Sequence, residues 1–552
     1  MIEQYFLAQR SDEPGIAVSV TRGAEVIARR FAGLASLPHR VPIGPETRFH
    51  IVSVSKTFLA AATIILASRG ALRLDDDVRA HVPELPSQYC GARTVTIRHL
   101  LSMTSGLRDV LEIQRLRGVW HPSPSRGRDL LDLAFRQTAA SARAGAQYMY
   151  ANVNFVLLAE IIARASGMSL DAFLHAEICR PLGLVATAAR PHEGVVLPDL
   201  AEPYVPDAAG AWSRATDLLG IAGDTLTSSL DDLTRWLLAL RAGRVNGIEV
   251  TAAMAERARL ADGRPVHYGL GLAVRRYRGL TVLCHTGTQP GYRAHLAFVP
   301  ERDVGLVVLS NRDDTRPTAL AAAIMEETIG DDFLARHPAA EARARSTMAG
   351  VAAEEVARIA GSYADRGTGE WITLAVEDGA LRGETLGDPF VLYRGSDGVF
   401  RDGEDYQATV PVELGVDLEP GRDDVTCRLD IGGQVVELVK CRAPAYTPAA
   451  LVDFAGVYES EEITSRHCVR VDGARLIVEY GLGLDGGLAF PMEPIAPDLF
   501  LVRPTAPGLA YRHVFRFNRD HAGAVQSAVV TMERLKGVVL RRAPARAETD
   551  RS

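Results

Sequence analysis

Alternating apolar and polar residues predict an antiparallel β-hairpin near the N-terminus. Apolar residues dominate positions 16–20, a turn sequence follows at Arg22-Gly23, and positions 24–28 resume the alternation. A second stretch with strand character runs from 268 to 310, and its predicted strands are 268–274, 280–285, 294–299 and 304–310. The short turn at 300–303 predicts that the last two strands are antiparallel neighbours.

Between these strands the apolar positions recur with the period of a helix. Helices are predicted over 97–104, 129–135, 155–164 and 231–240. A further helix contains the run 59–67, which is apolar on all sides and is therefore expected to be buried. The first 330 or so residues thus combine an antiparallel sheet with a helical region, which is an α+β arrangement.

The helical pattern stops after this region. Residues 334–352 are rich in alanine and basic residues, a composition typical of a linker. Beyond it, Ala360-Gly361-Ser362-Tyr363 recurs about 95 residues later as Ala455-Gly456-Val457-Tyr458. This repeat predicts two similar antiparallel β-barrels. The predicted organisation is an α+β domain at 1–332, a linker at 333–352, a first barrel at 353–445 and a second barrel at 446–552.

The composition of the 552 residues is that of a globular protein, with 47% hydrophobic and 23% charged residues. The net charge of −7 disfavours a nucleic-acid partner. No apolar run approaches the ~20 residues that span a membrane, so no membrane partner is expected. The N-terminus lacks a basic segment followed by an apolar core, which predicts a cytoplasmic protein. The six cysteines form no Cys-x-x-Cys pair, which fits reduced thiols.

The sequence Ser53-Val54-Ser55-Lys56 places a possible nucleophile beside a possible base. Residues three apart lie on one face of a helix, so the Ser53 hydroxyl and the Lys56 amine can touch if Ser53 opens the helix. Burial lowers the pKa of a lysine, and the positive end of a helix stabilises an alkoxide. A capping serine followed by a surface lysine gives the same pattern, so this pair alone does not establish catalysis.

Two further motifs accompany it: Tyr-Ala-Asn at 150–152 in a predicted loop, and His-Thr-Gly-Thr at 285–288 after a predicted strand. Together the three resemble the serine β-lactamase and penicillin-binding-protein superfamily, whose motifs are Ser-x-x-Lys, Ser/Tyr-x-Asn and Lys/His-Thr-Gly. The resemblance covers roughly residues 10–330 and implies a β-lactamase-like catalytic domain, here followed by two small antiparallel β-barrel domains. Residues 99–107 and 291–298 also resemble its class C, esterase and D-peptidase branch. That branch usually has histidine at the position of Met103, a difference that we interpret as structural.

The resemblance implies a role for each motif residue. Ser53 attacks the substrate carbonyl, and its proton passes to Lys56 or to Tyr150, an alternative that the sequence leaves open. Tyr150 then delivers a proton to the leaving amine. Asn152 orients either the substrate carbonyl or the Lys56 ammonium.

The third motif bears on transition-state binding and on specificity. Gly287 lets the strand approach the substrate, and the N–H groups of Ser53 and Thr288 are expected to form the oxyanion hole. His285 stands where penicillin-binding enzymes keep a lysine that holds the substrate's carboxylate. A largely neutral imidazole holds a carboxylate less well, which disfavours a carboxypeptidase and favours an esterase, amidase or aminopeptidase.

The three-part layout resembles the D-aminopeptidase branch of the superfamily. This implies a homodimeric serine hydrolase that releases small N-terminal D-residues from peptides, amides or esters. No sequence motif indicates a metal or an organic cofactor, so none is expected. A loop of the last domain, with Asp485 as its only charge, is then expected to bind the substrate's α-ammonium group. A surface β-turn explains the same loop equally well. The alternatives are an esterase or D,D-peptidase of the superfamily, and a catalytically inactive penicillin-binding-like protein.

Overall fold

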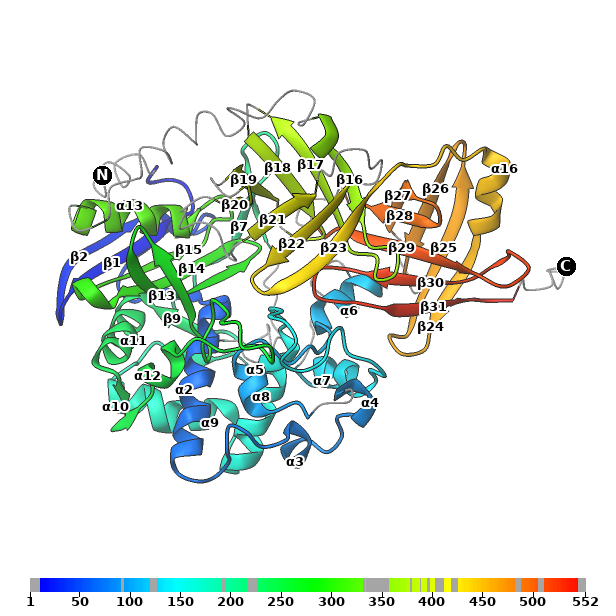
Figure 1. Ribbon diagram of the computed structural model, residues 1–552. Coiled ribbons are helices and arrows are strands. Elements are labelled where there is room, and N and C mark those ends of the chain that lie inside the picture. The colour runs from blue at the N-terminus through cyan, green and yellow to red at the C-terminus, as the bar shows by residue number, and fades with distance from the viewer. Residues whose placement is uncertain are drawn as a thin grey trace, which may run out of the picture.

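The computed structural model places an α+β domain beside two β-barrels (Figure 1). It describes residues 10–90, 94–119, 127–190, 195–215, 226–330, 333, 357–377, 380–387, 389–394, 398–402, 412–417, 425–481, 488–504 and 511–544. The α+β class and the two barrels are confirmed. Apart from Phe333, the linker predicted at 333–352 lies outside the described residues, and the exact domain limits stay a prediction.

Six antiparallel strands form the central sheet, in the order β12-β13-β14-β15-β1-β2. They are β1 (Ile16–Arg22), β2 (Glu25–Ala32), β12 (Ala273–Tyr277), β13 (Leu280–Gln289), β14 (Tyr292–Val299) and β15 (Val304–Ser310). The predicted hairpin and three of the four later strands are confirmed.

The strand predicted at 268–274 is displaced toward the C-terminus, since only β12 joins the sheet. The cause is Gly271, which has a φ of +78° and lies so close to α2 (Ser55–Ser68) that a Cβ on it would fall 2.5 Å from the Cβ of Ala60. A residue in this left-handed conformation cannot continue a strand.

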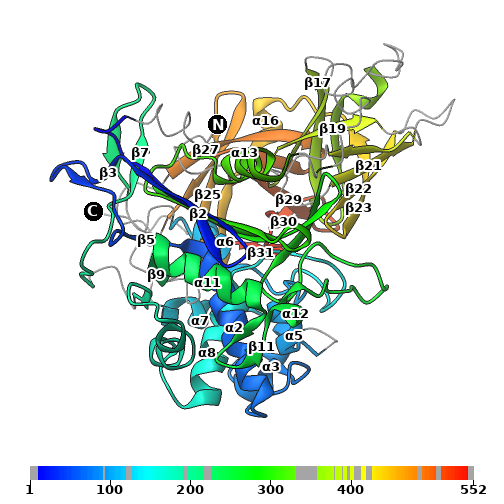
Figure 2. The same cartoon turned by 90° about the vertical axis from the view of Figure 1, so that its left-hand side faces the viewer.

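Helices cover both faces of the sheet, and all seven residues of β15 are buried. Helix α11 (Leu230–Ala242) lies on one face and α13 (Pro317–Ile329) on the other, as Figures 1 and 2 show. A hydrogen bond of 2.6 Å between the hydroxyls of Ser19 and Thr234 joins β1 to α11. Helix α13 was not predicted from the sequence.

Helix α2 runs through the middle of the helical region, and every residue from Ser55 to Leu66 is buried. This confirms the helix expected to be apolar on all sides. The ring of Phe58 stacks on Trp236 of α11, with centroids 4.2 Å apart. The other helices here are α3 (Val78–His81), α4 (Ser87–Cys90), α5 (Ile97–Leu101), α6 (Val110–Leu116), α7 (Gly127–Phe135), α8 (Val153–Ser166), α9 (Leu170–Leu174), α10 (Arg180–Leu182) and α12 (Thr251–Ala255).

Within the described ranges, no single helix has both the length and the apolar character to cross a membrane. The pair Val153–Ser166 and Leu170–Leu182, bent by 73°, meets the length and composition criteria only when taken together. Short strands complete the domain: β3 (Leu34–Ser36), β4 (Val41–Pro42), β5 (Arg48–His50), β6 (Ala188–Ala189), β7 (Tyr204–Pro206), β8 (Trp212–Arg214), β9 (Leu226–Ser229), β10 (Arg244–Val245) and β11 (Ile248–Glu249).

Each barrel is closed by eight antiparallel strands. The first contains β16 (Gly361–Ala364), β17 (Trp371–Glu377), β18 (Ala380–Thr385), β19 (Phe390–Arg394), β20 (Phe400–Asp402), β21 (Val412–Asp417), β22 (Thr426–Ile431) and β23 (Gln434–Cys441). The second contains β24 (Gly456–Ser460), β25 (Ser465–Asp472), β26 (Arg475–Tyr480), β27 (Leu488–Ala496), β28 (Leu499–Val502), β29 (His513–Arg519), β30 (Val525–Thr531) and β31 (Val538–Arg542), and is preceded by α16 (Pro448–Leu451).

The sequence repeat marks the same structural feature in both barrels. The buried Tyr363 donates its hydroxyl to the Ile359 carbonyl at 2.6 Å. The buried Tyr458 donates to the Phe454 carbonyl at 2.8 Å in the same way. The repeated tyrosine therefore ties the first strand of each barrel to the residues before it.

The second barrel docks against α6, which lies beside β31 in both views (Figures 1 and 2). Arg108, just before α6, forms a 2.6 Å ion pair with Glu462 and donates to the Gly537 carbonyl at 2.8 Å. At the other end of α6, His467 of β25 donates from Nε2 to the Leu116 carbonyl at 2.8 Å. Both ends of α6 are thereby fixed to the second barrel.

Candidate active site

Ser53 and Lys56 meet at the start of α2, as the spacing predicts. Ser53 lies in the 3₁₀ turn η1 (Val52–Val54), and Lys56 Nζ donates a hydrogen bond of 2.9 Å to Ser53 Oγ. The Lys56 side chain is 0% exposed. Val52 has a φ of +48°, a conformation that is costly for a β-branched residue and that places local strain immediately before the serine.

Tyr150 also lies close to Lys56. The Lys56 Nζ is 5.3 Å from the centroid of the Tyr150 ring, and the rings of Tyr150 and His285 are 6.2 Å apart. The structure therefore brings one residue of each motif around Lys56. An ammonium over a phenol face is an attractive cation–π arrangement.

Asp109 fixes the loop that carries Tyr150. Its carboxylate accepts the backbone N–H of Asn152, and it also caps α6 by accepting the N–H of Leu111 at 2.9 Å. Asn152 itself is buried and takes the N-cap position of α8. Asp109 thus joins the Tyr-Ala-Asn motif to the helix on which the second barrel docks.

Met103 also contacts the loop that carries Tyr150. It is buried, its carbonyl accepts the Met149 N–H at 2.8 Å, and its sulfur accepts from Asn154 Nδ2 at 3.2 Å. These contacts hold the segment that leads into Tyr150. They support the interpretation that methionine at this position is structural.

His285 is held as a neutral imidazole. Its Nδ1 donates to the Thr286 carbonyl at 3.0 Å, and its Nε2 accepts the Tyr268 hydroxyl at 2.9 Å. Burial, together with the nearby Lys56 charge, lowers the pKa of His285 to about 3. An uncharged ring with both nitrogens engaged is poorly suited to hold a carboxylate.

Gly287 lets strand β13 run against the serine turn. A Cβ at Gly287 would lie 2.5 Å from the Ile51 carbonyl oxygen and 3.1 Å from the Ser53 nitrogen. No side chain fits at those distances, so the close approach requires glycine. Thr288, the next residue, is exposed near the end of β13.

We expect Gly287→Ala to lower kcat/KM by about 100- to 1,000-fold, because the strand must move away from Ser53 and the Thr288 N–H, which is expected to form part of the oxyanion hole, moves with it. Steady-state kinetics would measure this change. Gly44→Ala is a matched control, since no atom lies within 4 Å of the Cβ that it adds. Equal activity of the two variants would show that the close approach has no catalytic role.

Arg534 is a site residue that sequence analysis missed. It belongs to the turn between β30 and β31, and its guanidinium carbon lies 5.3 Å from the centroid of the Tyr150 ring. No local pattern singles out this arginine, since only the docking of the second barrel brings it to Tyr150. Asp485, proposed to bind the substrate's ammonium, lies outside the described residues.

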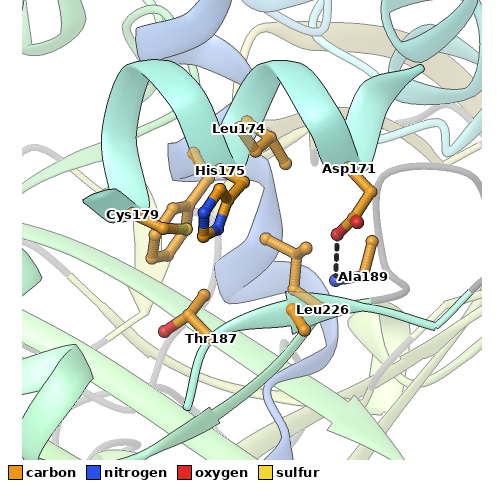
Figure 3. A pocket seen from close by; sticks show the side chains of 9 residues that line it. Asp171, Leu174, His175, Cys179, Thr187, Ala189 and Leu226 are labelled. Carbon is orange, nitrogen blue, oxygen red and sulfur yellow. Dashed lines mark hydrogen bonds between the residues drawn. The ribbon is translucent and has the colours of Figure 1, made fainter. Parts of the chain in front are cut away.

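A pocket elsewhere in the domain lies between the helix of Asp171 to Cys179 and strands β6 and β9 (Figure 3). Its lining is mostly apolar, and burial raises the pKa of the Cys179 thiol there to about 12. Asp171 is engaged in a 3.0 Å hydrogen bond from the Ala189 N–H. Because none of the motif residues lines it, we interpret this pocket as a packing gap.

In the part of the chain that the structure describes, no group of three or more His, Cys, Asp and Glu side chains is arranged to hold a metal ion. The acidic turn at 75–77 is held by contacts with other residues of the chain. Asp75 pairs with Arg98 at 2.8 Å, and Asp77 caps α3.

Known proteins with similar sequences match more than half of the chain. A D-aminopeptidase from Gluconobacter oxydans is 28% identical over 325 residues, which cover 59% of this chain and 60% of the relative. Penicillin-binding protein 4* from Bacillus subtilis is 28% identical over 313 residues, covering 54% of this chain and 68% of the relative. The match thus spans about three fifths of the D-aminopeptidase's length.

Among solved structures, the octameric penicillin-binding protein homologue from Pyrococcus abyssi aligns with a TM-score of 0.54 and 22% identity. The alignment covers 80% of this chain and 98% of that one, and at this identity it shows a shared fold. The Beta-lactamase family model matches residues 4–330, more than half of the chain. Because this model matches more than half of the chain, and the matched region contains Ser53 and Lys56, the chain belongs to the Beta-lactamase family.

Proposed function

We propose that this protein is a serine hydrolase that releases small N-terminal D-residues, such as D-alanine, from peptides, amides or esters. The observation that carries the proposal is the buried Lys56 amine at 2.9 Å from the Ser53 hydroxyl, with Tyr150 beside it. A serine in such a position is activated when a neighbouring group takes its proton. Similarity to D-aminopeptidases supports the substrate class.

In the proposed reaction, Ser53 Oγ bonds to the substrate carbonyl carbon while its proton passes to Lys56 or Tyr150. The oxyanion is stabilised by the N–H groups of Ser53 and Thr288. The close approach of Gly287 to the Ser53 nitrogen supports this assignment, because it brings the strand that carries Thr288 next to Ser53. The carbon–nitrogen bond then breaks as Tyr150 protonates the leaving amine. Water attacks the resulting ester of Ser53 and releases the D-amino acid. Asn152 orients the substrate carbonyl or the Lys56 ammonium.

The neutral His285 supports an enzyme that does not hold a substrate carboxylate at this motif. We further propose that Asp485 binds the substrate's α-ammonium. The residues just before its loop lie against the catalytic domain, since a Cβ at Gly118, beyond the end of α6, would fall 3.0 Å from the Gly481 nitrogen. If Asp485→Asn leaves hydrolysis of free D-substrates unchanged, this role is wrong.

The function is tested by hydrolysis of D-alanine and L-alanine p-nitroanilides beside N-acetyl-D-alanine p-nitroanilide. We expect activity on the free D-substrate, little on the other two, and none with the Ser53→Ala control. Activity mainly on the blocked substrate or on simple esters would contradict the aminopeptidase and favour an esterase or D,D-peptidase. Absence of covalent labelling of Ser53 by a serine-reactive phosphonate would instead indicate an inactive binding protein.

Tyr150→Phe separates the two candidate bases. If Tyr150 only protonates the leaving group, the variant should lose about 100- to 10,000-fold in kcat/KM on an amide. It should lose much less on a p-nitrophenyl ester, whose leaving phenolate needs no proton. Parallel loss on both substrates would make Tyr150, rather than Lys56, the acylation base.

A further inference from the structure

The turn between β30 and β31, residues 532–537, reaches from the second barrel to the catalytic site. The turn is closed by a 2.7 Å hydrogen bond from the Met532 N–H to the Leu535 carbonyl. At its tip the Arg534 guanidinium faces the Tyr150 ring at 5.3 Å. The same ring has Lys56 Nζ 5.3 Å from its centroid, so two basic side chains lie near one phenol.

The backbone of this turn is fixed to the catalytic domain. The Asp109 N–H donates to the Arg534 carbonyl at 3.0 Å, and the Arg534 N–H donates to the buried Glu112 carboxyl at 2.8 Å. The Lys536 N–H donates to Ser141 Oγ at 3.1 Å. Since Asp109 also holds the N–H of Asn152, the turn and the Tyr-Ala-Asn motif share one anchor.

Lys536 also links the turn to the first barrel. Its ammonium pairs with Glu370 at 2.6 Å, and both side chains are largely buried. The turn is therefore held by all three domains. Because the backbone is already fixed, the position of the Arg534 Cα is set before substrate binds. This pre-organisation lowers the entropy cost of binding.

The Arg534 side chain retains capacity to bind an anion. Its guanidinium pairs with the neighbouring Glu533 at 3.3 Å, a carboxylate that is itself 39% exposed, and the carboxyl groups of Glu112 and Asp109 also lie close enough to act on its charge. The Arg534 Nε is buried without a hydrogen-bond partner among the described residues, while the side chain as a whole is 28% exposed. A planar guanidinium matches the two oxygens of a carboxylate.

We propose that Arg534 is a substrate-binding residue that holds the free carboxylate of the leaving amino acid. The preferred substrates are then short peptides in which the leaving amino acid is the C-terminal residue. The proposal rests on the proposed function, which places the leaving amine beside Tyr150. In a dipeptide the carboxylate carbon is two bonds from the leaving nitrogen. A guanidinium next to Tyr150, which protonates that nitrogen, is therefore close to the carboxylate. His285, being neutral, does not supply this interaction.

The test uses four substrates with the full-length enzyme: D-alanyl-glycine and D-alanyl-glycinamide, and the N-acetylated form of each. The ratio of kcat/KM for a carboxylate substrate to that for its amide reports recognition of the carboxylate. The ratio for a free substrate to its acetylated form reports the aminopeptidase function. The two ratios are independent, so either hypothesis can fail alone.

We expect Arg534→Met to lower the carboxylate-to-amide ratio by about 10- to 100-fold, mainly through KM, because a charge-assisted hydrogen bond is lost. Arg534→Lys should recover part of the ratio. Arg541→Met, an exposed position on β31 of the same barrel, is the matched control. An unchanged ratio in Arg534→Met would overturn the proposal, and an equal fall on both substrates would make Arg534 a positioning residue for Tyr150.

Discussion

Replacing Lys56 with methionine is expected to lower kcat/KM by about 10,000-fold or more without unfolding the protein. Lys56 Nζ is in direct hydrogen-bond contact with Ser53 Oγ, and removal of either member of such a unit abolishes most of the catalysis. Methionine has similar length and no charge, so it suits a side chain that is 0% exposed. Steady-state kinetics and thermal melting would measure the two properties separately.

The double variant Ser53→Ala/Lys56→Met makes this prediction sharper. Residues that act as one unit are not additive, so the double variant should be as inactive as Ser53→Ala alone. A further loss in the double variant would mean that Lys56 also acts through another group, of which Tyr150 is the nearest candidate. Activity of Lys56→Met within tenfold of the wild type would exclude Lys56 from the proton path.

Much of the catalytic domain follows from periodicity and spacing. Ser53 and Lys56 meet because a separation of three residues places them on one face, and α2 is buried because its apolar positions surround it. The repeated Tyr363 and Tyr458 predicted two barrels, since each anchors the first strand of its own barrel. These features depend on local sequence, which is why they can be inferred from it.

The features that could not be predicted from the sequence depend mostly on contacts between segments that are distant in the chain. The strand at 268–274 was misplaced because the approach of Gly271 to Ala60 decides where β12 begins. Arg534 was missed because its role depends on the docking of the second barrel on α6 through Arg108. The alanine-rich α13 has little contrast between its faces, so its periodicity gave no prediction.

Acidification below about pH 6.5 is expected to destabilise the protein steeply. Burial lowers the pKa of His285, His295 and His467 to about 3 and that of His513 to about 4. In the unfolded chain a histidine has a pKa near 6.5, so below that pH the unfolded state binds protons that the folded state does not. Stability is therefore fully present above about pH 6.5 and is lost as the pH falls toward the folded values, by about 1.4 kcal/mol per pH unit for each histidine.

Glu112 acts in the opposite direction at higher pH. Burial raises its pKa to about 8, so its contribution to stability is present below the unfolded value near 4.5 and is lost as the pH rises toward 8. Burial also lowers the pKa of His267 to about 4. Because these five histidines oppose one carboxyl group, the net effect between pH 5 and 6.5 is a rise in stability with pH. Denaturant unfolding at fixed temperature across pH 5–8 would measure it, with a maximum expected near pH 6.5.

His467→Gln provides the specific variant for this prediction. His467 donates from Nε2 to the Leu116 carbonyl at 2.8 Å, and a glutamine amide can donate to the same oxygen without titrating. The variant should therefore take up about one proton fewer on unfolding below pH 6.5. Its free energy of unfolding should fall less steeply with decreasing pH than that of the wild type. If wild type and variant fall with the same slope, His467 is protonated in the folded protein, and α6 is held to the second barrel by a charged imidazolium.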